Sequence, residues 1–130
     1  MRFMNIQDLS NTVDGTLITN TRDMRRVAKG AFAADLMSDV LASIQPEAVL
    51  ITGLCNPQVV RTAHMADVTA IILVRGKQAP AETIDLANEE EIPIISTPYG
   101  MYEACVRLNQ AGLRSLEQPL DSHDCECQDE

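Results

Sequence analysis

Tryptophan is absent from the sequence, and phenylalanine and tyrosine together make up only 3 % of its 130 residues. A nucleic-acid groove that binds bases by aromatic stacking is therefore poorly supplied. Positive charge is also scarce, with ten basic residues against nineteen acidic ones and a net charge of −9. Such a chain repels phosphate backbones and anionic membrane surfaces. We therefore expect neither nucleic acid nor a membrane as a partner.

Long hydrophobic runs are missing as well. No stretch reaches the roughly 18 apolar residues that a membrane-spanning helix needs. The first residues also lack the apolar segment of a secretory signal. We therefore expect a cytoplasmic protein whose four cysteines are reduced rather than bridged.

The common catalytic motifs are absent. The sequence has no glycine-rich P-loop ending in Gly-Lys and Ser or Thr, and no Gly-x-Gly-x-x-Gly dinucleotide fingerprint. Only two histidines exist, His64 and His123, and no serine or cysteine in the sequence is visibly tied to His64 as a nucleophile would be to its base. We predict a protein that is not an enzyme and that uses no cofactor.

The feature that is present is a repeated unit over residues 48–112. Each unit begins with a short run rich in Ile and Val, as strands buried on both faces are. These runs are residues 48–53, 69–75 and 92–97. Each is followed by a proline-started segment with helical periodicity, and the openers are Asn56-Pro57, Ala79-Pro80 and Thr97-Pro98. This βαβαβα pattern predicts a single α/β domain with a mainly parallel sheet flanked by helices.

The flanking segments extend this core. Residues 3–9 alternate weakly, which favours a strand or a docking arm, and residues 16–19 read as a short strand after Asp14-Gly15. Residues 31–44 show the apolar spacing of an amphipathic helix. We place the domain at residues 1–113 and interpret residues 114–130, which carry six acids and one arginine, as a disordered acidic tail.

Two further features concern partners. The segment 20–29 holds four of the ten basic residues, which indicates either an anion or partner site or, as the favoured interpretation, a solvated loop. Five large apolar residues lie outside the repeated units and exceed the needs of a small sheet, so we expect some of them to cover a partner subunit. They are Phe3, Met4, Met24, Phe32 and Met37.

A ligand site is expected beyond the carboxyl ends of the parallel strands, where open α/β sheets bind ligands. Helix N-termini at that edge favour an anion, and Lys77 adds positive charge. The candidate ligand-binding residues are Gly53, Asn56, Arg75, Gly76, Thr97 and Tyr99. A purely structural interpretation is the favoured alternative, because Asn56 and Thr97 are ordinary helix caps and the glycines are ordinary turn residues.

The cysteines offer an alternative function. Cys55 precedes a helix N-terminus, where a thiolate is favoured, so a redox role is one alternative to its filling a small buried space. His123, Cys125 and Cys127 form a second candidate, a metal-binding tail, although a single Cys-x-Cys with one histidine lacks the paired ligands of a structural zinc site. Cys105 is expected in the core. We assign no metal ligand.

The stretches Ala34–Val40, Val49–Gly53, Ala70–Gly76, Glu82–Ala87 and Ile92–Pro98 resemble the DRTGG domain family over roughly residues 10–112. The family name suggests an Asp-Arg-Thr and a Gly-Gly pair, where this chain has Gly-Leu-Cys-Asn and Arg-Gly. The resemblance implies a compact α/β domain similar to the non-catalytic N-terminal domain of HPr kinase/phosphorylase and to regulatory domains of phosphotransacetylases and CBS-type pyrophosphatases. It also implies a tendency to form dimers, and it carries over no catalytic residue.

These observations together predict a non-catalytic regulatory or interaction domain that forms a homodimer. The predicted ligand is a small anion or a nucleotide, bound at the carboxyl ends of the strands. The alternative is an accessory or redox protein that depends on a thiol or a metal, through Cys55 or through the tail residues His123, Cys125 and Cys127.

Overall fold

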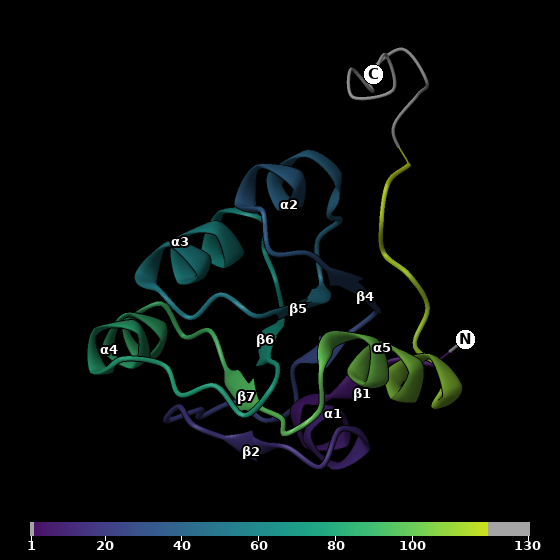
Figure 1. Ribbon diagram of the computed structural model, residues 1–130, viewed down its shortest axis with the longest axis horizontal. Helices are drawn as coiled ribbons and strands as arrows, with labels where there is room; N and C mark the ends of the chain where they lie inside the picture. The colour runs from purple at the N-terminus through teal and green to yellow at the C-terminus, as the bar shows by residue number, and fades with distance from the viewer. Residues whose placement is uncertain (1, 120–130) are drawn as a thin grey trace.

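The structure, a computed structural model, describes residues 2–119. Figure 1 shows the elements as a layered α/β arrangement. In chain order they are β1 (Met4–Asn5), α1 (Ile6–Thr12), β2 (Thr16–Leu17), β3 (Val27–Ala28), β4 (Gly30–Ala33), α2 (Met37–Ser43), β5 (Ala48–Thr52), α3 (Pro57–Met65), β6 (Ala70–Leu73), α4 (Ala81–Glu89), β7 (Ile94–Ser96) and α5 (Met101–Gln110).

The centre of the molecule is a five-stranded sheet in the order β2-β7-β6-β5-β4. Strands β4 to β7 are mutually parallel, and the short β2 pairs antiparallel with β7. Every residue of β5 and β6 is buried, as their unbroken apolar runs predict. The predicted α/β fold with a mainly parallel, helix-flanked sheet is confirmed.

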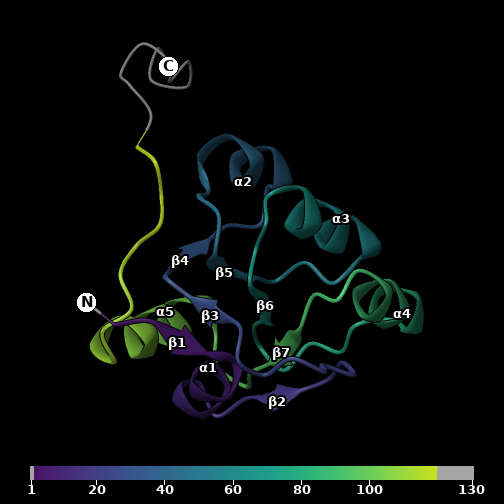
Figure 2. The same cartoon turned by 180° about the vertical axis from the view of Figure 1, so that it is seen from behind.

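Helices cover both faces of this sheet. In Figures 1 and 2, α2, α3 and α4 lie along one face, while α1 and α5 lie on the other. Alternate residues of a strand supply the two cores, since Leu50 packs toward α2 and α3 whereas Val49 and Ile51 pack toward α1 and α5. A separate two-stranded sheet, β1 with β3, contributes buried Met4 and Ala28 to the core on the α1 and α5 side.

The helix predicted over residues 31–44 is wrong in its first half. Residues 30–33 form β4, which pairs in parallel with β5, and the helix α2 begins only at Met37. Phe32 lies opposite Leu50 in this register and is only 7 % exposed. Pairing with β5 and burial of Phe32 therefore override the helical spacing that the sequence suggests.

At the N-terminus the predicted strand is only two residues long. Asn5 ends β1 and caps helix α1, because its side chain accepts a hydrogen bond from the Asp8 N–H at 2.8 Å. The Asp8 carboxylate in turn accepts from the Asn5 N–H. This reciprocal capping box holds α1 in place of a continued strand.

The three proline openers do not start their helices in the same way. Pro57 occupies the first position of α3, as expected, with Asn56 as its N-cap. Pro80 is itself the N-cap of α4. Helix α5 begins at Met101 with Gly100 as the N-cap, so Thr97-Pro98 belongs to a loop and its prediction as a helix start is wrong.

The ordered unit continues past residue 113. Residues 114–116 lie along the outer edge of β4, where the Ala31 N–H donates to Arg114 O and the Leu116 N–H donates to Ala31 O. Residues 116–118 then bond to residues 43–45 at the end of α2. Leu116 is only 5 % exposed. Residues 120–130, the rest of the predicted tail, lie outside the described residues.

Most of the apolar residues that seemed in excess are used inside the domain. Met4 is fully buried and Phe32 nearly so, while Met24 and Met37 pack against the two cores. Phe3 alone among the five is half exposed, with Lys29 Nζ 5.7 Å from its ring centre. These five residues therefore give little reason to expect a partner subunit.

Candidate functional site

The carboxyl ends of the parallel strands meet at one edge of the sheet, and the loops that follow β5, β6 and β7 carry all six predicted site residues. Gly53 and Asn56 follow β5, and Arg75 and Gly76 follow β6. Thr97 and Tyr99 follow β7. The structure therefore brings these loops to one edge, which we call the carboxyl edge.

Arg75 and Gly76 form a tight turn that is joined to the loop after β7. Both residues have left-handed backbones, with φ of 63° and 64°. The Arg75 N–H donates to Tyr99 O at 2.7 Å, and the Gly76 N–H donates to Thr97 O at 2.7 Å. These two backbone hydrogen bonds fix the turn and leave the Arg75 side chain exposed to solvent.

Thr97 holds the loop after β7 in place through its buried side chain. Its side chain is fully buried, its hydroxyl donates to Val13 O at 2.7 Å, and the same hydroxyl accepts from the Tyr99 N–H at 3.2 Å. Both functions of the hydroxyl are thus used to hold the loop. The contribution of Thr97 visible in the structure is to shape the edge.

Tyr99 fastens the same loop to the turn before β2. Its hydroxyl donates to the Asp14 carboxylate, and this hydrogen bond raises the pKa of Tyr99 above its ordinary value, with a smaller rise from burial. The Arg107 guanidinium lies over the ring, 4.1 Å from its centre, and approaches Asp14 at 3.8 Å. Tyr99 therefore also serves to position the loop.

Positive charge at the carboxyl edge comes from Arg75 and Lys77, both exposed. A Cβ placed on Gly100 would lie 3.9 Å from the Arg75 guanidinium, so this side chain extends beside the start of α5. No side chain caps that helix. An exposed guanidinium and the amide end of a helix thus lie together, an arrangement that suits an anionic group.

A carboxylate that the sequence did not single out occupies the β5 part of this edge. Asp35 Oδ1 accepts hydrogen bonds from the Gly53 N–H at 2.7 Å and from the Thr52 hydroxyl at 3.0 Å. Asn56 likewise uses its side-chain oxygen to cap α3 through the Val59 N–H. Asp35 lies in the stretch that the sequence predicts as helix. It follows the end of β4, so it could have been assigned to the carboxyl edge only if β4 had been predicted as a strand.

The cysteines that the structure describes are half buried and free. Cys55 packs against the core on the α3 side, and its carbonyl oxygen accepts from the Thr83 hydroxyl at 2.8 Å. Cys105 packs against the other core, where burial raises the pKa of its thiol. No cluster of metal-ligating side chains occurs within residues 2–119, and His123, Cys125 and Cys127 lie outside that range.

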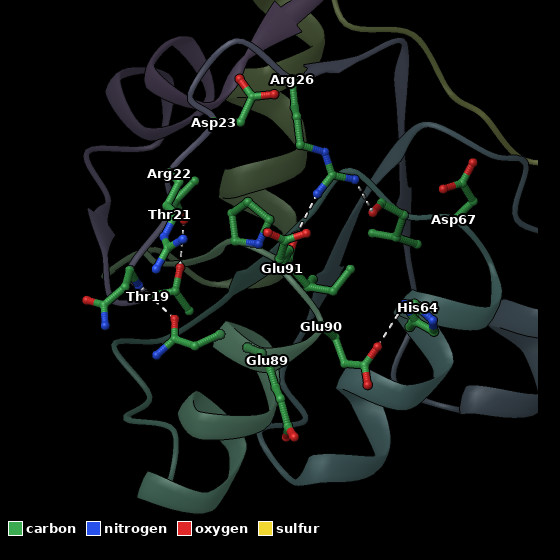
Figure 3. A pocket seen from close by; sticks show the side chains of 16 residues that line it. Thr19, Thr21, Arg22, Asp23, Arg26, His64, Asp67, Glu89, Glu90 and Glu91 are labelled. Atoms are coloured by element: carbon green, nitrogen blue, oxygen red, sulfur yellow. Dashed lines mark hydrogen bonds and ion pairs between the residues drawn. The ribbon is translucent and has the colours of Figure 1, made fainter.

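A hollow lies at the opposite, amino edge of the sheet, and Figure 3 shows it from close by. Its volume is about 690 Å³. One wall is the segment 19–26, which follows β2, and the other comes from the ends of α3 and α4 and the residues before β6 and β7. None of the six predicted site residues lines this hollow.

The fold and the carboxyl edge define a small α/β domain whose parallel strands end at loops that carry Arg75, Lys77 and Asp35. The DRTGG domain family matches residues 8–111, and the chain belongs to this family. Among curated proteins, none matches the sequence.

One solved structure similar to this chain is the crystal structure of the CBS and DRTGG domains of the regulatory region of Clostridium perfringens pyrophosphatase, complexed with the activator diadenosine tetraphosphate. The two agree with a TM-score of 0.69 at 17 % sequence identity. The match covers 96 % of this chain but 56 % of the other, so this chain spans little more than half of that one. The likeness supports the α/β fold. Within residues 2–119, no helix has the length and apolar character needed to cross a membrane.

Proposed function

We propose that this protein is a non-catalytic regulatory domain that binds a small anionic ligand, a nucleotide in particular, at the carboxyl edge of its sheet. The observation that carries the proposal is the exposed Arg75 guanidinium, which a hydrogen-bonded turn holds beside the uncapped start of α5. A guanidinium binds phosphate oxygens through two parallel hydrogen bonds, and helix amides add to this attraction.

The charges around the edge decide where on it the anion binds. Asp35 already occupies the Gly53 N–H, and its carboxylate repels a second anion at the end of β5. Arg75 and Lys77 follow β6 and lie next to the loop after β7. The phosphate therefore binds over the ends of β6 and β7, with the Arg75 side chain as its main contact.

Family membership supports a regulatory role. In the pyrophosphatase structure the DRTGG domain belongs to a regulatory region, and that region is complexed with a nucleotide activator. A nucleotide carries the phosphate that suits the Arg75 side of the edge. We further propose that the protein acts without catalysing a reaction, in the cytoplasm, and as a homodimer.

A thermal-shift and calorimetric titration tests the site. Diadenosine tetraphosphate, ATP, ADP and acetyl phosphate are the probes, and a binder at about 100 times its Kd stabilises the fold by about 2.7 kcal/mol. The substitution Arg75→Gln keeps a polar side chain on the left-handed backbone of this residue but removes the guanidinium and its charge. We expect this variant to bind the stabilising probe about tenfold more weakly, as loss of a charged hydrogen bond implies.

The matched control is Arg22→Gln, since Arg22 is also exposed but lies at the opposite edge of the sheet. This control should bind the probe as tightly as the parent protein. Equal weakening by both substitutions would show a general charge effect and not a site. Absence of stabilisation by every probe would refute the proposed ligand class.

A further inference from the structure

A second hollow lies between helix α5, strand β4 and the segment 113–117, and we call it the α5 groove. Its volume is about 260 Å³. Its floor is apolar and is formed by Ala31 and Ala33 of β4, Ile51 of β5 and Leu108 of α5. Ala33 is exposed, so α5 leaves this end of β4 uncovered. The residues of the proposed anion site do not line this groove, which is therefore a separate feature.

One thiol lines the α5 groove. Cys105 of α5 is half buried and packs against the core on the α1 and α5 side. It forms no disulfide within residues 2–119. A thiolate is a strong ligand for zinc, but a structural zinc site takes four protein ligands. Cys105 needs three more donors, and the residues that the structure describes hold no cluster of metal ligands to supply them.

The chain returns to this groove after α5. The segment 114–116 lies along the outer edge of β4, where Ser115 pairs in parallel with Ala31. Glu117 then lines the groove together with Cys105. In Figures 1 and 2 this segment is the yellow stretch that leaves α5 and passes β4. The described residues end at 119, so the rest of the chain continues from the wall of the groove.

The sequence beyond this point carries the missing donors. His123, Cys125 and Cys127 lie at alternate positions within a stretch of five residues. The six residues from Glu117 to His123 can span up to about 20 Å, and the ten residues to Cys127 up to about 33 Å. A helix with its side chains is only about 10–12 Å wide. All three donors can therefore reach the Cys105 thiol on the helix that borders the groove.

From this arrangement we infer that the protein binds one Zn²⁺ at the α5 groove, with Cys105, His123, Cys125 and Cys127 as its four ligands. Three thiolates and one imidazole form one of the usual tetrahedral donor sets of structural zinc. The metal displaces the proton of each thiol, so three protons are released for each ion bound. The segment that carries the other three ligands then covers the apolar floor at Ala33. This site differs from the carboxyl edge in both place and ligand class.

Titration of the untagged, full-length, reduced protein with Co²⁺ and then with Zn²⁺ tests the ligand set. Tetrahedral Co²⁺ absorbs visible light, and each thiolate bound to it adds charge-transfer absorption in the near ultraviolet. We expect one Co²⁺ per chain with the absorption of three thiolates, displaced by one equivalent of Zn²⁺. Cys105→Ser should retain two thiolates and bind Zn²⁺ about 100-fold more weakly, because loss of even an outer partner of a metal ligand costs about 10- to 100-fold.

Cys55→Ser is the matched control, since Cys55 is also a half-buried free cysteine but packs against the opposite core. This control should keep the cobalt spectrum and the zinc affinity of the parent protein. If Cys105→Ser keeps them as well, the metal lies on the tail alone and the inference is overturned. A parent protein that binds no Zn²⁺ at micromolar concentration overturns it too.

A further measurement needs no variant and stays decisive if Cys105→Ser does not fold. In the ¹⁵N-labelled parent protein, one equivalent of Zn²⁺ should shift the amide signals of Ala33 and Asn109, which line the groove. The amide signal of Gly76, at the carboxyl edge, should stay unchanged. Shifts confined to residues 120–130 would contradict a metal site at the α5 groove.

Discussion

At the scale of single residues, three acidic residues have a left-handed backbone just before the three central parallel strands, β5, β6 and β7. Glu47, Asp67 and Glu91 have φ of 66°, 55° and 57°, and each lies one or two residues before β5, β6 or β7 begins its apolar run. A residue with a Cβ is strained in this conformation by about 1 kcal/mol or more, whereas glycine is not.

Glu91 allows this strain to be measured, since its exposed side chain has no partner among residues 2–119. We expect Glu91→Gly to be more stable than Glu91→Ala by about 1 kcal/mol, because both remove the same carboxylate and only alanine keeps the strained Cβ. Urea unfolding of the two variants measures the difference. Alanine as stable as glycine would show that the turn carries no strain.

Tyr99 provides a second prediction at this scale. Its hydrogen bond to Asp14 raises its pKa above 10.0. The neutral phenol is thus favoured by folding, so the bond's contribution to stability is present in full below the unfolded pKa of about 10 and is lost as pH rises through the higher folded pKa. Ultraviolet titration of a Tyr102→Phe variant, in which Tyr99 is the remaining tyrosine, should give a midpoint above 10.0.

Asp14→Asn is the matched test of the cause. Asparagine keeps the size of the side chain and tolerates the left-handed backbone of residue 14, where φ is 49°, but it removes the negative charge. The Tyr99 midpoint should then fall in the Tyr102→Phe background. If it stays where it was, the carboxylate is not the group that raises it.

At the scale of elements, the sequence predicts the strands that are buried on both faces and not those at the margins. Strands β5, β6 and β7 lie inside the three predicted runs. A continuous run of Ile and Val is typical of a strand that helices cover on both faces, so these strands are predictable from the sequence. Strand β4 lies at the edge, and its Gly-Ala-Phe-Ala sequence carries no such excess of branched residues. The pairing of β4 with β5 makes these residues a strand, and the sequence alone does not reveal that pairing.

The same distinction limits prediction of the site. Arg75, Gly76 and Tyr99 could be assigned to one edge from topology alone, because they follow neighbouring parallel strands. Asp35 could not, since its position depends on β4. The hollow at the amino edge could not be predicted either, because its wall, the segment 19–26, is joined to α4 through Asn20 and Asn88, which lie 68 residues apart in the chain.

The segment 114–118 gives a prediction about an element edge. Leu116 is 5 % exposed beside β4, and a Cβ on Gly30 would lie 2.5 Å from Leu116 Cγ and 2.7 Å from Arg114 O. We expect Leu116→Ala to lower the free energy of unfolding by about 2 kcal/mol, within the usual cost of a buried leucine. Chemical denaturation measures it, with Met65→Ala as the control because Met65 is 71 % exposed and should change stability by less than about 0.5 kcal/mol.

Gly30→Ala tests the same edge from the other side. The added methyl group cannot fit while residues 114–116 keep their hydrogen bonds to Ala31, so either that pairing or β4 must shift. Hydrogen exchange should show faster exchange at the Leu116 amide in this variant. Unchanged protection there would mean that the segment is not held against β4 in solution.

At the scale of the whole molecule, the two edges of the sheet differ in charge. The carboxyl edge presents Arg75 and Lys77, and the amino edge presents mainly acids. The Arg75→Gln and Arg22→Gln variants each remove one exposed positive charge, from opposite edges of the same sheet, so a binding loss confined to Arg75→Gln locates the anion at the carboxyl edge.

The proposed homodimer is also a question at this scale, because association must overcome the repulsion between two chains of net charge −9. Two large apolar residues of the α2 region, Leu36 and Leu41, are 62 % and 49 % exposed. We expect sedimentation velocity at micromolar concentration to show more dimer as salt rises from about 0.02 M to about 0.3 M, because screening weakens the repulsion without weakening apolar contact.

A Leu36→Ser, Leu41→Ser double variant should reduce the dimer fraction at every salt concentration if α2 lies in the interface. Met65→Ser is the matched control, since it removes a single exposed apolar side chain from the neighbouring helix. A monomer throughout the salt range would rule out a tight dimer. A dimer that weakens as salt rises would mean that opposite charges, and not the apolar surface of α2, hold the two chains together.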